Sequence, residues 1–140
     1  HLLLAGKGVL LEKCRELVTQ LNLNSRVHFL GLRFDIPNLL KTADIVILSS
    51  QYEGLSLSCI EGLASGKPFV ASDVPGLREI VDNKKLLFPF QNDIAFEQII
   101  LELLDDKNKY DAAVNHCLQR AKQYDMTKMI ENHIQLYQSS

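Results

Sequence analysis

The chain has 140 residues, of which 46% are hydrophobic and 23% are charged, and its formal net charge at pH 7 is −2. These values are typical of one globular domain with a hydrophobic core, and they exclude a disordered chain. No apolar run approaches the roughly 20 residues of a membrane-spanning helix, and a negative net charge is untypical of proteins that bind nucleic acid.

Strands and helices alternate in the first part of the sequence. Residues 1–5, HLLLA, form an apolar run that predicts a buried strand, and residues 9–23 repeat apolar side chains at helical spacing. Residues 26–31 then predict a second strand, residues 36–43 a short helix with proline near its start, and residues 44–50 a third strand.

The same alternation continues to the last third of the chain. The predicted elements are a helix at 57–65, a strand at 68–72, a helical turn at 76–81, a strand at 85–90 and helices from Asp93 onward. Because the strands are nearly continuous runs of Val, Ile, Leu and Phe, we expect a parallel sheet that is covered on both faces. The predicted fold is therefore α/β, a doubly wound parallel sheet with C-terminal helices.

The cysteines and the first residues indicate the cellular setting. Cys14, Cys59 and Cys117 lie far apart in apolar helical patterns, which argues against a disulfide framework and against a zinc site. We expect reduced thiols in the core of a cytoplasmic protein.

The chain starts with His1 inside a predicted strand, without a signal peptide before it, so we expect a piece of a longer protein.

A ligand site is expected at one edge of the predicted sheet. In open parallel sheets, ligands bind outside the carboxyl ends of the strands, where the helices begin. In this chain those ends are residues 6–8, 31–33, 49–58 and 73–76.

Glu53 lies in the third of these ends, and Glu61 lies in the helix that follows it. Glu53 follows the strand at 44–50, and Gly54 would allow a ligand to approach the backbone closely. Glu61 falls about one turn into the next helix, where we expect a mostly covered surface and polar partners for its charge. The helix dipole alone can also favour a glutamate there, and Glu53 can be an ordinary loop residue.

The start of the helix that contains Glu61 is a candidate phosphate site. Ser56 or Ser58 would cap this helix with its hydroxyl group. The free N–H groups and the positive end of the helix dipole attract an anion.

The segment YEGLSLSCIEGLASGKPFVASDVPGLREIV, residues 52–81, resembles the signature of the family 4 retaining glycosyltransferases, EGxxLxxxEaxAxGkPvvasdvgGxxEiv. Glu53 and Glu61 stand at its two glutamates. The other matching residues are Gly54, Leu57, Ala64, Gly66, Lys67, Pro68, Gly76 and Glu79. The resemblance also includes LLLAGKG at 2–8 and residues 21–50, so it covers nearly the whole chain.

The resemblance implies a GT-B fold, in which two Rossmann-like domains are combined and the C-terminal one binds most of the donor. Residues 1–140 would be this single donor-binding domain, one half of the fold and a fragment of a longer enzyme. The whole enzyme would be a hexosyltransferase that uses a nucleotide-diphosphate sugar and retains the anomeric configuration. The departing phosphate would act as the base, and no metal or other cofactor is implied.

The resemblance also assigns roles to individual residues. Glu53 would be the catalytic carboxylate near the hydroxyls of the donor sugar, and Glu61 would accept hydrogen bonds from the ribose. Next to Gly54, the sugar and the diphosphate would meet the backbone of Leu55, Ser56, Leu57 and Ser58. The nucleotide base would be flanked by the loop of Gly31, Leu32 and Arg33.

This sequence departs from the family pattern in three respects. Ser56 stands where many members have glycine, and residues 82–93 lack a glycine that is common in the family. The arginine and lysine that neutralise the leaving diphosphate in other members would lie before His1, as would the acceptor-binding domain. We therefore expect the chain alone to bind donor weakly and to be inactive, with Lys7 and Arg33 as ordinary surface charges.

The expected partners are a nucleotide-sugar donor and an acceptor glycan or glycolipid that binds the absent domain, and no nucleic acid. The enzyme would serve polysaccharide or glycolipid synthesis in the cytoplasm, either free or at the inner face of the membrane. Two alternatives remain open, a nucleotide-sugar epimerase of GT-B-like fold and a non-catalytic Rossmann-like interaction domain. A hydride-transfer enzyme is disfavoured because no Gly-x-Gly-x-x-Gly follows the first strand.

Overall fold

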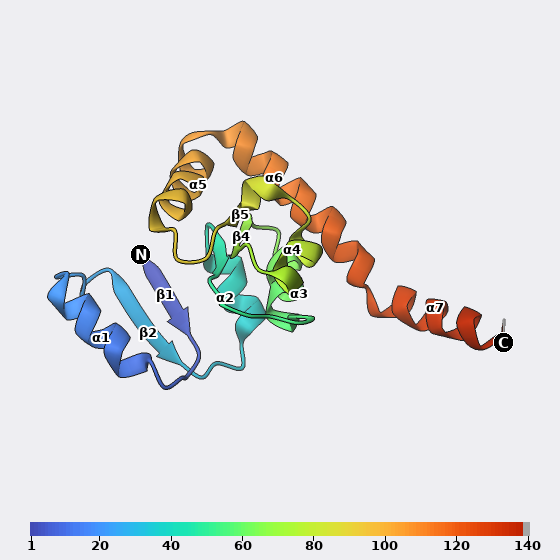
Figure 1. Cartoon of the computed structure of the whole chain (residues 1–140), viewed down its shortest axis with the longest axis horizontal. Helices are drawn as coiled ribbons and strands as arrows, with labels where there is room; N and C mark the ends of the chain where they lie inside the picture. Colours follow the sequence, from blue (N-terminus) through green and yellow to red (C-terminus); the bar gives the residue numbers. More distant parts are fainter. Residues whose placement is uncertain (139–140) are drawn as a thin grey trace. The chain divides into compact units, whose positions relative to one another are not determined.

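A computed structural model describes residues 1–138 of the chain (Figure 1). The chain divides into two compact units, His1–Ile36 and Pro37–Ser140. Its strands form two parallel sheets, one of two strands and one of three.

The first unit contains a two-stranded sheet and one helix. Strand β1 (Leu2–Ala5) pairs in parallel with β2 (Val27–Gly31), in a register that places Leu2 opposite Val27. Helix α1 (Leu11–Gln20) connects the two strands and lies beside them (Figure 1). Such a crossover helix is the usual connection between adjacent parallel strands.

The sequence predicts a buried first strand and a buried Cys14, and both predictions are wrong. No residue of 1–36 is buried, and Leu2 and Leu3 of β1 are 42% and 43% exposed. Cys14, which we expected in the core, is exposed on α1. The physical reason is that one helix can cover only one face of a sheet, and this unit has a single helix of its own for two strands.

The second unit is built around a three-stranded parallel sheet in the order β3-β4-β5. Its strands are β3 (Val46–Leu48), β4 (Phe69–Ser72) and β5 (Leu87–Phe88). The helices before and between them are α2 (Ile36–Thr42), α3 (Leu57–Ala64), α4 (Pro75–Val81) and the 3₁₀ turn η1 (Lys84–Leu86). The predicted order of strands and helices is confirmed.

The C-terminal helical region is divided by two aspartates. It consists of α5 (Asp93–Asp105), α6 (Lys107–Ala121), the 3₁₀ turn η2 (Lys122–Tyr124) and α7 (Met126–Gln138). The carboxylate of Asp106 accepts hydrogen bonds from the backbone N–H groups of Asn108 and Lys109, so it begins α6 as an N-cap. Asp125 accepts in the same way from the N–H of Thr127.

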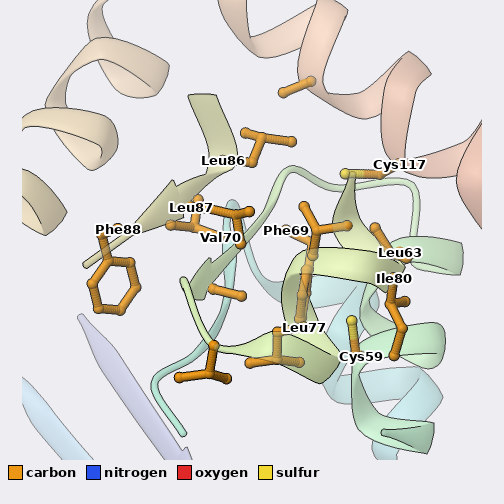
Figure 2. Packing of buried hydrophobic residues seen from close by; sticks show 14 of the residues in the cluster. Cys59, Leu63, Phe69, Val70, Leu77, Ile80, Leu86, Leu87, Phe88 and Cys117 are labelled. Carbon is orange, nitrogen blue, oxygen red and sulfur yellow. The ribbon is translucent and has the colours of Figure 1, made fainter. Parts of the chain in front are cut away.

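Strand β4 lies at the centre of the core, and all four of its residues are buried. Figure 2 shows Phe69 and Val70 of this strand among side chains of the surrounding helices and of β5, including Leu63, Leu77 and Leu87. Helix α3 packs tightly on this strand. At Gly62 of this helix, a Cβ atom would overlap the ring of Phe69, so the close packing requires glycine there.

Two of the three cysteines lie in the core, as predicted. Cys59 on α3 and Cys117 on α6 are fully buried, and the two helices pack against each other (Figure 2). Burial raises the pKa of Cys59 to about 12 and also raises the pKa of Cys117. Both thiols therefore stay protonated at neutral pH and act as small apolar side chains.

Side chains of α6 fix the end of α4. The guanidinium of Arg120 donates to the carbonyl oxygens of Glu79 at 2.6 Å and Ile80 at 3.0 Å. A ring nitrogen of His116 lies 2.7 Å from the carbonyl oxygen of Val81. The last carbonyl groups of a helix have no partners within the helix, so these contacts satisfy them and hold α4 against α6.

Candidate functional site

The candidate site lies in the second unit, where the chain leaves β3 and β4. Glu53 is half-buried in the loop after β3. The hydroxyl of Ser50, in the same loop, donates a hydrogen bond of 2.7 Å to the Oε1 atom of Glu53. Ser72 is the fully buried last residue of β4, and its hydroxyl donates to the backbone carbonyl of Ser50. The Glu53 carboxylate is thus connected to the core through two serines.

Gly76 supports the same loop from the side of α4. A Cβ atom at Gly76 would overlap the carbonyl oxygens of both Glu53 and Gly54. Only a glycine allows the first turn of α4 to lie this close to the loop backbone. Gly54 itself is exposed, and a Cβ atom there would meet no atom within 4 Å. Its backbone is therefore accessible to a ligand.

The N-terminus of α3 follows directly after this loop. Ser56 is 7% exposed and caps the helix, since its hydroxyl accepts a hydrogen bond of 3.3 Å from the N–H of Cys59. The prediction that Ser56 or Ser58 caps the helix is confirmed for Ser56. Among the described residues, no acceptor is present for the N–H groups of Leu57 and Ser58, which lie in the first turn. Two donors at the positive end of the helix dipole are thus available to an anion.

Glu61 lies on the exposed face of α3, so the expectation of a mostly covered surface is wrong. The face of α3 with Cys59, Gly62 and Leu63 is buried, and helical spacing turns Glu61 to the opposite side. Within the described part of the chain, no hydrogen bond or ion pair engages the carboxylate of Glu61. The carboxylate can therefore accept hydrogen bonds from the hydroxyls of a ligand.

Leu57 and Ala64 are exposed on the same face as Glu61, as the helical spacing predicts. Leu55, which precedes the cap, is 70% exposed, and Ser58 is exposed as well. All the predicted donor-binding residues of α3 and the preceding loop are thus at the surface except Ser56, whose side chain is used for capping.

The predicted base-flanking residues Gly31, Leu32 and Arg33 belong to the first unit. Gly31 has a φ of +64°, which a glycine adopts without strain, and Leu32 is exposed. The guanidinium of Arg33 forms two hydrogen bonds with the carboxylate of Asp35, at 2.8 Å and 2.6 Å. These bonds raise the pKa of Arg33 and lower that of Asp35. The charge of Arg33 is therefore already paired at the surface.

A second ion pair, which the sequence did not indicate, lies at the carboxyl end of β4. The Nε atom of Arg78 on α4 is 2.6 Å from Oδ1 of Asp73, and this contact raises the pKa of Arg78. The roles of Ser50 and Ser72 were also missed. The sequence does contain a signal for these two roles, because Ser50 and Ser72 each stand at the end of a predicted strand.

Other features of the described residues do not coincide with this site. Within residues 1–138, no three His, Cys, Asp or Glu side chains gather in the way that would hold a metal ion. A hollow of about 550 Å³ lies in the first unit, where Arg15, Thr19 and His28 form part of its wall, and it contains no predicted site residue. None of the described helices is long and apolar enough to cross a membrane.

Comparison with known proteins gives consistent results. The family model described as "Glycosyl transferases group 1" matches residues 1–120. The UDP-Gal:alpha-D-GlcNAc-diphosphoundecaprenol alpha-1,3-galactosyltransferase of Escherichia coli is 35% identical over 107 residues, which are 74% of this chain and 28% of that protein. The N,N'-diacetylbacillosaminyl-diphospho-undecaprenol alpha-1,3-N-acetylgalactosaminyltransferase of Campylobacter jejuni is 39% identical over 115 residues, 79% of this chain and 30% of that protein. The chain thus spans less than a third of these two relatives.

The fold is also found in solved structures. The crystal structure of Anabaena HepE in complex with UDP superposes with a TM-score of 0.90 at 25% identity, over 99% of this chain and 40% of that chain. A second crystal structure of the same protein, in complex with UDP-glucose, gives a TM-score of 0.88. The predicted Rossmann-like α/β fold, as found in GT-B glycosyltransferases, is confirmed by these likenesses.

Proposed function

Since the chain belongs to the glycosyl transferases group 1 family, we propose that residues 1–140 are the donor-binding domain of a longer, retaining glycosyltransferase. This enzyme transfers a hexosyl group from a nucleotide-diphosphate sugar to an acceptor. One observation carries the proposal: Glu53 in the preceding loop and Glu61 in α3 flank, along the chain, a helix N-terminus at which the N–H groups of Leu57 and Ser58 have no acceptor among the described residues.

The order of these groups matches the order of groups in the donor. A nucleotide-diphosphate sugar has an anionic diphosphate in its middle and hydroxyl groups on both sides, those of the sugar and those of the ribose. The N–H groups of Leu57 and Ser58, which have no acceptor in the described part of the chain, suit the diphosphate. The carboxylates of Glu53 and Glu61 suit the hydroxyls of the sugar and of the ribose, because ionised carboxylates only accept hydrogen bonds.

The remaining contacts of the donor follow from the same placement. The backbone at Gly54 and Leu55 approaches the sugar, and Ser56 contributes its backbone while its hydroxyl stays on the helix cap. For Gly31, Leu32 and Arg33, which belong to the first unit, the role beside the base rests on the family resemblance alone.

In the proposed reaction, the acceptor hydroxyl attacks the sugar on the face from which the phosphate departs, and this phosphate takes the proton. Glu53 is the catalytic carboxylate that holds the sugar hydroxyls, and no side chain of this chain becomes a covalent nucleophile. The site needs no metal ion in this mechanism.

The departing diphosphate requires positive charge, and two arginines of the chain that stand at strand ends are already paired. Arg33 is bonded to Asp35, and Arg78 to Asp73. Stabilisation of charge at the leaving group contributes several orders of magnitude to the rate of such reactions. As the family resemblance implies, we assign the cations that neutralise the diphosphate to a part of the enzyme outside residues 1–140.

The acceptor is proposed to be a glycan or a glycolipid that binds the other domain of the enzyme. The names of both bacterial relatives contain a sugar linked to diphosphoundecaprenol, which is a lipid carrier. These names support a role in polysaccharide or glycolipid synthesis. The proposed location of the enzyme is the cytoplasm or the inner face of the membrane.

Isothermal titration calorimetry of the full-length protein with UDP, GDP and ADP tests the nucleotide site. If Glu61 binds the ribose, Glu61→Ala should lower the affinity for the preferred nucleotide by about 10- to 100-fold, because hydrogen bonds to a charged group contribute about 1.5–3 kcal/mol. Glu97→Ala is a matched control, since Glu97 is also exposed one turn into a helix, α5, but lies outside the site. An unchanged affinity of the Glu61 variant would contradict the ribose role.

A further inference from the structure

We propose that Ser50 is a positioning residue that sets the orientation of the Glu53 carboxylate toward the sugar of the donor. This inference rests on the proposed function of the site.

The hydrogen bond between the two residues is directional. The hydroxyl of Ser50 donates to Oε1 of Glu53 at 2.7 Å, in a half-buried position. Hydrogen bonds to an ionised acceptor are stronger than those between neutral groups. Since no described residue bonds to Oε2 of Glu53, this second oxygen is left for the hydroxyl of a ligand. One oxygen is thus used to hold the side chain, and the other is used to bind.

Ser50 is held in its turn by the core of the second unit. Ser72 ends the fully buried strand β4, and its hydroxyl donates to the carbonyl of Ser50. Gly76 of α4 also lies close to this loop, since a Cβ atom at this position would overlap the carbonyl oxygens of Glu53 and Gly54. Strand β4 and helix α4 therefore hold the loop in place, and within the loop the hydroxyl of Ser50 holds the carboxylate of Glu53.

A positioning role and a purely structural role predict different binding data. Loss of the Ser50 hydroxyl would let the Glu53 side chain rotate, which weakens contacts with the sugar. The diphosphate and the ribose are assigned to the start of α3 and to Glu61, so their binding should not change. A structural role alone would weaken the binding of every part of the donor, or of none.

The experiment uses the full-length protein and matched pairs of ligands: UDP with UDP-glucose, GDP with GDP-mannose, and ADP with ADP-glucose. Calorimetry first identifies the pair that binds the wild type. We then expect Ser50→Ala to lose about tenfold in affinity for the nucleotide sugar, as for a lost hydrogen bond to a charged group, and to keep its affinity for the nucleoside diphosphate. Ser50→Thr keeps the hydroxyl and should restore sugar binding.

Ser65→Ala is the matched control. Ser65 is also half-buried and also donates one hydrogen bond, of 2.6 Å to the carbonyl of Gly62, but it lies at the other end of α3. This variant should bind both ligands as the wild type does. Retained affinity for the nucleoside diphosphate shows that each variant is folded.

Two results for the Ser50 variant would overturn the positioning role: unchanged affinity for the nucleotide sugar, or an equal loss for both members of the pair. A wild type that binds none of the six ligands would instead overturn the proposed function itself.

Discussion

Glu53 and Glu61 are the two glutamates of the family signature, but the structure gives them different surroundings. Glu53 is half-buried and is hydrogen-bonded to Ser50, whereas Glu61 is exposed and has no partner among the described residues. An exposed, unpaired carboxylate on a helix contributes little to stability. Effects of Glu61 variants on nucleotide binding can therefore be separated from effects on folding, which is why the calorimetric test uses this residue.

The three cysteines should differ strongly in reactivity toward a thiol reagent. Cys59 and Cys117 are buried, and burial raises the pKa of Cys59 to about 12, so its thiolate is rare at pH 8. Because the thiolate is the reactive form, iodoacetamide at pH 8 should label the exposed Cys14 and spare the other two until the protein unfolds. Mass spectrometry of the labelled peptides measures this. Equal labelling of all three in the native protein would contradict the described core.

At the scale of the elements, helix α4 links the core to the candidate site. Its C-terminal carbonyls are bound by Arg120 and His116 of α6, and its first turn lies against the loop that carries Glu53. A displacement of α4 would therefore move the Glu53 loop as well.

Gly76→Ala tests this connection. The added methyl group would overlap the carbonyl oxygens of Glu53 and Gly54, which belong to the backbone and cannot rotate away. We expect a loss of about 1–3 kcal/mol in the free energy of unfolding, as for other overpacked sites, together with weaker donor binding. Denaturant unfolding measures the stability of the variant.

Gly8→Ala is the control for this substitution. A Cβ atom at Gly8 would meet no atom within 4 Å, and its backbone does not require a positive φ. This variant should unfold within about 0.5 kcal/mol of the wild type. Equal stability of the Gly76 and Gly8 variants would show that α4 does not support the loop in this way.

At the scale of the whole molecule, the chain spans 28% of the Escherichia coli relative and 30% of the Campylobacter jejuni relative. The prediction that residues 1–140 are one donor-binding domain of a longer enzyme stays a prediction. It is compatible with the exposed apolar residues of the first unit, among them Leu2 and Leu3.

Residues 1–140 alone should not transfer sugar. The reaction needs cations for the diphosphate and a site for the acceptor, and both are proposed to lie outside this chain. The measurement is the release of nucleoside diphosphate from the preferred nucleotide sugar, with the full-length enzyme as the positive control. Detectable transfer by the isolated chain would show that the diphosphate is neutralised by residues described here.

The sequence alone determined the order of the strands and helices and the parallel α/β class, and it predicted the sheet edge at which the candidate site is proposed. These properties depend on local patterns: apolar runs, helical spacing, and the rule that ligands bind at the carboxyl ends of parallel strands. The N-cap of α3 was predictable to within two serines for the same reason, because capping involves residues that are close in the chain.

Only the tertiary structure decided which faces are covered and which distant residues meet. The exposure of Cys14 and Glu61 depends on how many elements are available to cover each face, and no local pattern contains this information. The contacts of Ser72 with Ser50 and of Gly76 with Glu53 join residues more than twenty positions apart. They exist because β3 and β4 pair side by side, which brings the ends of two separate segments together.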